Sequence, residues 1–216
     1  MKLFKIVLVV LALLVNLAIA QPSWADRPRL TQSADYTEVT QTLDNLLKAK
    51  DSPDSFGATP EEIQQKIGDL QLQKYILETA KDWGRCRNET GKTLAIYAHK
   101  PKKSFFPTSD QSTLYYLGDG QETDDDWSCD GVYLPSDAKV AGLTAGDTQG
   151  QELGEPVALK IVSGTQLVAK TSTETGAVEF NVSPAKVFKA GAANWSIPTL
   201  SQADIDSQTT NAPIDD

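Results

Sequence analysis

The chain has 216 residues, with 20 basic side chains, 29 acidic ones and one histidine, for a net charge of −9 at neutral pH. This length suffices for one well-buried core or two small ones. The acidic balance argues against nucleic acid and anionic lipid headgroups as partners, because both carry negative charge themselves.

The first 25 residues predict a secretory signal peptide. Lys2 and Lys5 precede an apolar run over 6–20, and Ser23-Trp24-Ala25 places small residues at −3 and −1 of a cleavage site. The apolar run is shorter than the roughly 20 residues of a membrane span. We therefore expect an exported protein that is cleaved after Ala25, with Ala20 as the competing site. Cleavage leaves 18 basic against 29 acidic residues, a net charge of −11.

Two helices are expected next. Apolar residues at steps of three and four predict a helix over about 35–50. Thr59, Pro60 and Glu62 form a capping-box pattern that predicts the start of a second helix, which runs to about Gly84. Because a short loop joins them, the two helices are expected to pack as an antiparallel hairpin.

The apolar pattern then changes to a period of two, which predicts an antiparallel sheet. The expected strands are 93–98, 113–117 and 132–134. Three further β segments are expected at 156–162, 165–171 and 177–182, with Ser163-Gly164 as a two-residue hairpin turn. Polar, acidic residues from Ser201 onward predict a disordered tail.

Together these elements predict an α+β fold, with an N-terminal helical hairpin packed on an antiparallel β-sheet, followed by a small all-β unit. The expected organisation is a signal peptide (1–25), the hairpin and sheet (26–135), a linker or long loop (136–155), the small β unit (156–200) and the acidic tail (201–216).

Cys86 and Cys129 are the two cysteines, 43 positions apart. In an exported chain such a pair predicts one disulfide. The alternative is a reactive thiol pair or half of a metal site, but the sequence has no C-x-x-C motif and no second histidine.

Each cysteine follows a tryptophan closely. Trp83 lies three residues before Cys86, and Trp127 lies two residues before Cys129. A disulfide would bring both indoles into one neighbourhood, where they could shield the bridge. They could instead form an aromatic patch for a sugar ring or a partner protein.

A basic and aromatic segment stands out in this acidic chain, and it is our candidate interface. Its residues are Lys100, Lys102, Lys103, Phe105 and Phe106. Such a segment can be a solvated loop, or it can be a docking loop, because aromatic and basic side chains often anchor interfaces.

The sequence contains no assembled catalytic set and predicts no cofactor. Asp119, Asp124 and Asp126 are weak candidates for calcium, since carboxylate oxygens suit that ion but the EF-hand order is absent. His99 could act as a base only beside a hydroxyl brought near by the fold. Its lysine neighbours suggest instead an exposed histidine at a strand end.

The leader residues 21–25, placed before Asp26, resemble the leaders of cyanobacterial periplasmic and thylakoid-lumen proteins. That resemblance implies one of these two compartments and a photosynthetic membrane complex as a candidate partner. The functional hypothesis is therefore an exported, non-catalytic binding or accessory protein that acts through a protein interface. The alternative is an exported hydrolase or carbohydrate-binding protein that uses carboxylates and the two tryptophans.

Overall fold

The computed structural model describes residues 29–49, 59–101, 112–143, 150–192 and 195–214. The expected signal peptide and four residues of the candidate interface, Lys102, Lys103, Phe105 and Phe106, lie outside the described residues. The helices are η2 (Leu30–Gln32), α2 (Ala34–Ala49), α3 (Pro60–Thr79) and α4 (Gln202–Asp206). The strands are β1 (Arg85–Glu89), β2 (Leu94–His99), β3 (Thr113–Leu117), β4 (Ser128–Leu134), β5 (Lys139–Val140), β6 (Gln151–Glu152), β7 (Val157–Lys160), β8 (Gln166–Thr171), β9 (Val178–Phe180) and β10 (Lys186–Lys189).

The strands form two five-stranded sheets, and the presence of helices and sheets together agrees with the α+β class. The first sheet has the order β1-β8-β9-β5-β6 and mixes parallel and antiparallel pairs. The second has the order β10-β7-β4-β2-β3 and is antiparallel throughout. Buried residues from both sheets, including Ile96, Val132, Leu159 and Leu167, share one core. The two sheets therefore pack face to face over this core, as in a β-sandwich.

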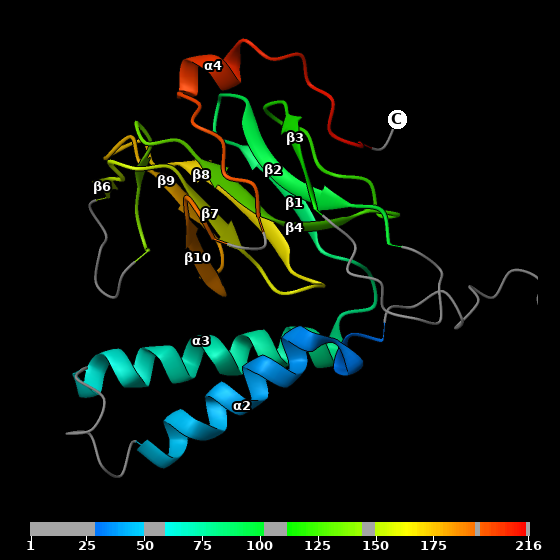
Figure 1. Cartoon of the computed structure of the whole chain (residues 1–216), viewed down its shortest axis with the longest axis vertical. Coiled ribbons are helices and arrows are strands. Elements are labelled where there is room, and N and C mark those ends of the chain that lie inside the picture. The colour runs from blue at the N-terminus through cyan, green and yellow to red at the C-terminus, as the bar shows by residue number, and fades with distance from the viewer. Residues whose placement is uncertain (1–28, 50–58, 102–111, 144–149, 193–194, 215–216) are drawn as a thin grey trace, which may run out of the picture.

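The helical hairpin covers one side of this sandwich (Figure 1). The predicted start of α3 is confirmed, because the Thr59 hydroxyl accepts the Glu62 N–H and the Glu62 carboxylate accepts the Thr59 N–H. Apolar residues of both helices form a second core with Val162 of the sandwich. Two ion pairs, Lys160 with Asp35 and Lys186 with Glu38, also join α2 to the second sheet.

A disulfide joins the two sheets across the main core. Cys86 lies in β1 of the first sheet and Cys129 in β4 of the second, with 5.8 Å between their Cα atoms. Both residues are fully buried. The bridge therefore connects the two layers of the sandwich.

The structure differs from the expected small β unit over 156–200. β7 pairs with β4 in the second sheet, whereas β8 pairs in parallel with β1 in the first. The chain thus crosses between sheets at Ser163-Gly164, where a hairpin turn was expected. Gly164 has a positive φ of 84°, which favours glycine. A Cβ at this position would also overlap the side chains of Ala80 and Leu30, because the turn packs closely against the helical layer.

Residues 136–155 differ in part from the expected linker. Within them, β5 and β6 pair with each other and β5 also pairs with β9. Residues 144–149, between these strands, lie outside the described residues.

The expected disordered tail also needs correction. Residues 195–214, here called the C-terminal strap, cross the outer face of the second sheet and include α4 (Figure 1). Ile205 is 1% exposed, and the Trp195 ring lies 4.5 Å from the Tyr97 ring. The hydroxyls of Tyr97 and Tyr133 donate to the strap carbonyls of Ser196 and Pro198. Burial beneath the strap raises the pKa of both tyrosines. Composition predicted disorder because the apolar residues that anchor the strap are few and widely spaced.

Among the described residues, no helix combines the length and the apolar character needed to cross a membrane.

Candidate functional site

Three side chains at one end of the second sheet form a basic-aromatic cluster: Lys100, Tyr115 and Trp127. Lys100 follows β2 and is exposed, and its Nζ lies 6.0 Å from the centroid of the Trp127 ring. Tyr115, in β3, meets the same indole edge-on with 5.6 Å between the ring centroids. The half-buried indole is thus fixed on one side by the core while Lys100 remains at the surface. A lysine over an aromatic face is stabilised by the ring quadrupole.

Asp130 lies at the same end of the sheet and contacts three polar residues, and the four residues together are here called the carboxylate cluster: His99, Ser112, Ser128 and Asp130. One carboxylate oxygen lies 2.6 Å from His99 Nδ1 and accepts the Ser112 hydroxyl at 2.7 Å. The other accepts the Ser128 hydroxyl at 3.1 Å. The side chains of His99 and Asp130 are only 20% and 13% exposed, so His99 is not the exposed histidine that its lysine neighbours suggested.

The geometry of the carboxylate cluster differs from that of a serine nucleophile. In a catalytic triad the serine hydroxyl donates to the imidazole, and the carboxylate orients the other ring nitrogen. Here Ser112 and Ser128 both donate to the carboxylate of Asp130. These bonds tie β2, β4 and the residue before β3 together beneath the basic-aromatic cluster. The carboxylate cluster therefore holds the strand ends beside the basic-aromatic cluster in one fixed arrangement.

The two tryptophans do not form one patch. Trp83 packs with the helical core around Leu77 and Val162, whereas Trp127 packs against the core of the sandwich. Both are half-buried. The disulfide joins the two segments that carry these tryptophans, but the Trp83 side chain packs in the helical layer and the Trp127 side chain packs in the sandwich.

Two of the three candidate calcium ligands, Asp119 and Asp124, have separate local roles. Asp119 accepts the backbone N–H of Gly91 at 2.8 Å, and Asp124 accepts that of Asp126 at 2.7 Å. Within the described residues, no group of three or more histidine, cysteine or acidic side chains is placed to hold a metal ion.

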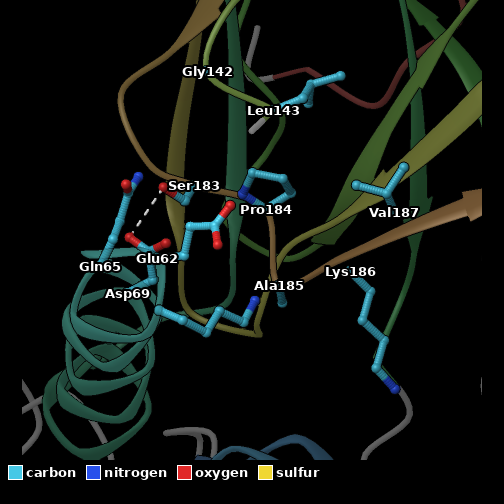
Figure 2. Close-up of a pocket in the computed structure, with 11 residues that line it drawn as sticks. Glu62, Gln65, Asp69, Gly142, Leu143, Ser183, Pro184, Ala185, Lys186 and Val187 are labelled. Carbon is cyan, nitrogen blue, oxygen red and sulfur yellow. Dashed lines mark hydrogen bonds between the residues drawn. The ribbon is translucent and has the colours of Figure 1, made fainter. Parts of the chain in front are cut away.

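A second candidate is a polar cleft of about 300 Å³ between α3 and the segment that leads into β10 (Figure 2). Glu62, Lys66 and Asp69 line it from α3. Ser183 faces Asp69 from the other side, where Lys186 also contributes to the lining. Much of this charge already has a partner. Ser183 donates to Asp69 at 3.2 Å, Glu62 caps its own helix, and Lys186 pairs with Glu38. The cleft therefore offers little unsatisfied chemistry to a ligand, and neither Trp83 nor Trp127 lines it.

Sequence reasoning identified Lys100 and Trp127 but missed Ser112, Ser128 and the pairing of His99 with Asp130. A signal existed in the strand register. Ser128 pairs with His99 in the antiparallel ladder, and Asp130 follows it by two positions. That register depends on a β-bulge at Tyr97 and Ala98, which the sequence pattern alone does not reveal.

A comparison of the chain with family models, with curated proteins and with solved structures finds no match.

Proposed function

We propose that this protein is an exported, non-catalytic binding protein that acts through a protein interface at the basic-aromatic cluster. The supporting observation is the geometry around Trp127, whose indole is held between the core, the Tyr115 ring and the Lys100 ammonium. Tryptophan and tyrosine rings are typical of the residues that contribute most to protein interfaces, and a lysine beside them can act as a rim charge that steers association.

The local charge supports the same proposal. The whole chain carries a net charge of −9, and Lys100 begins a Lys-Pro-Lys-Lys run that is a local basic exception in this acidic sequence. The sequence continues with Lys102, Lys103, Phe105 and Phe106, which remain part of the predicted interface. A partner with an acidic rim would complement such a surface and would be steered toward it.

The proposal includes export and a location in the periplasm or the thylakoid lumen. The basis for both is the leader sequence, and the buried disulfide and the absence of a spanning helix among the described residues are compatible with them. A photosynthetic membrane complex is the partner that the resemblance of the leader suggests. The proposed partner is therefore a protein component of such a complex.

Photo-crosslinking in native material provides the first test. A benzophenone amino acid at position 100 should crosslink the exported protein to one discrete membrane-associated protein. Recovery of the whole population as a free, uncrosslinked monomer would contradict the proposal.

A charge reversal then tests the crosslinked partner in purified form. Lys100→Glu should slow association at low salt and weaken its salt dependence, because charges at the rim act mainly on the encounter rate. Lys48→Glu is the matched control, since Lys48 is also exposed but lies in the last turn of α2, in the helical layer. Equal association rates for the two variants would show that the cluster is not the interface.

A further inference from the structure

A cavity of about 220 Å³ lies at the other end of the sandwich, beneath α4. It is bounded by the β1–β2 turn, the chain that follows β4, the β8–β9 connection and the strap. Figure 1 shows α4 over this end of the sheets. The strap thus completes a cavity that the two sheets alone would leave open.

The walls of this end cavity are mostly apolar. The apolar part is formed by Leu94, Ala95, Leu134, Ala138, Val178 and Ile205, and Thr90, Thr93, Thr171 and Gln202 add polar groups. The apolar side chains come from both sheets and from α4, and packing against the rest of the core holds them in place. Because the walls belong to well-packed elements, the cavity is formed before any ligand arrives.

The charged residues of the cavity are exposed and lie at its rim: Lys92, Asp137 and Lys139. Two of them already have partners. Both carboxylate oxygens of Asp137 accept the backbone N–H of Gln202, at 3.1 and 3.2 Å, and Lys139 donates to the Thr175 carbonyl at 3.0 Å. Within the described residues, the Lys92 ammonium makes no hydrogen bond or ion pair. An unpaired cation therefore stands beside an apolar cavity.

We propose that the end cavity binds a small organic acid, with its apolar body against the walls and its carboxylate at Lys92. The walls favour an alkyl or aromatic group because burial removes apolar surface from water. Lys92 selects an anion over a neutral or cationic ligand of the same shape. Lys139 donates to the Thr175 carbonyl and the backbone N–H of Thr93 donates to Asp206, so Lys92 is the rim cation that has no partner among the described residues.

The size of the cavity restricts the ligand further. Sites for drug-sized molecules measure about 300–1,000 Å³, and 220 Å³ is smaller than that range. A short-chain or single-ring carboxylate fits, and hexanoate is a suitable probe. This site is separate from the proposed protein interface, and neither proposal depends on the other.

The test is a titration of the purified protein with hexanoate, followed by nuclear magnetic resonance. Saturable shifts are expected at Thr93, Ala138 and Ile205. 1-Hexanol has the chain without the charge, and acetate has the charge without the chain, so each should bind more weakly than hexanoate. Equal responses to all three compounds, or no saturable shift with hexanoate, would overturn the proposal.

Two substitutions separate the charge from the cavity. Lys92→Gln should raise the dissociation constant of hexanoate about two- to five-fold, the range expected for an exposed ion pair. Lys81→Gln is the control. Lys81 is also exposed, but it precedes β1, whereas Lys92 follows β1, and Lys81 does not line the cavity. Ala138→Leu should fill the cavity and abolish the saturable shifts.

The outcome for each variant is decisive. Equal affinities of Lys92→Gln and Lys81→Gln for hexanoate would refute the role of Lys92. Unchanged binding by a folded Ala138→Leu protein would refute the cavity as the site. If Ala138→Leu does not fold, the lysine pair and the three-compound comparison still decide the proposal.

Discussion

Removal of the disulfide between Cys86 and Cys129 is the perturbation whose cost can be worked out most directly. The bridge closes a loop with a sequence separation of 43 residues. For a loop of that length, the restriction of the unfolded chain is worth about 4 kcal/mol at 25 °C. In a chain of this size each kcal/mol shifts the thermal midpoint by about 2–4 °C. The thermal midpoint of the Cys86→Ala/Cys129→Ala variant should therefore be lower than that of the wild type by roughly 8–16 °C.

Urea unfolding of oxidised wild type, reduced wild type and the double-alanine variant is the appropriate assay. Reduction keeps both sulfur atoms in the fully buried sites, so it isolates the cross-link from the packing of the side chains. Both perturbed forms should lose stability, and the alanine variant should lose somewhat more because it also leaves a small void. A loss below about 1 kcal/mol in both forms would refute the loop-entropy reasoning. It would show that burial alone holds β1 against β4.

Two further predictions concern packing. Gly131→Ala should lower the free energy of unfolding by at least about 1–3 kcal/mol, because its Cβ would overlap the Leu159 carbonyl oxygen and approach the Trp195 ring to 2.7 Å. Gly68→Ala is the control on α3, where a Cβ meets nothing within 4 Å, and it should raise stability by about 0.5–1 kcal/mol in the same urea assay. Gln73→Leu should raise stability by about 1–3 kcal/mol, because the Gln73 side chain is 5% exposed and its buried Nε2 has no partner among the described residues. A lower thermal midpoint for Gln73→Leu would show that the amide is satisfied by water or by a shift of α3.

Local patterns predicted the elements whose signals are local. The capping box fixed the start of α3, and β3 has the predicted bounds of 113–117. β1 was missed because its sequence, Arg-Cys-Arg-Asn-Glu, has little apolar alternation. It forms a strand through partners distant in sequence, since it pairs in parallel with β8. Its other side meets the segment around Glu122. A strand stabilised in this way leaves almost no signal in its own composition.

The candidate site was predictable to the same limited extent. Lys100 and Trp127 could be singled out by residue type, because they are unusual in this acidic chain. Their contact could not be predicted, since it depends on how β2 and β4 are paired. The end cavity was not predictable at all. Its walls come from both sheets and from a strap whose composition suggested disorder.

The positions of the two proposed sites follow from one element, β2. Lys100 directly follows its last residue, and Lys92 lies two positions before its first. At about 3.4 Å per residue, the six residues of β2 extend over about 20 Å. β2 is hydrogen-bonded to β3 on one side and to β4 on the other, and five of its six side chains are buried. A strand paired on both sides and buried in this way is closely packed, and close packing keeps its two ends at a fixed separation. β2 therefore acts as a rigid spacer that holds a basic-aromatic cluster and an apolar cavity at opposite ends of one sandwich.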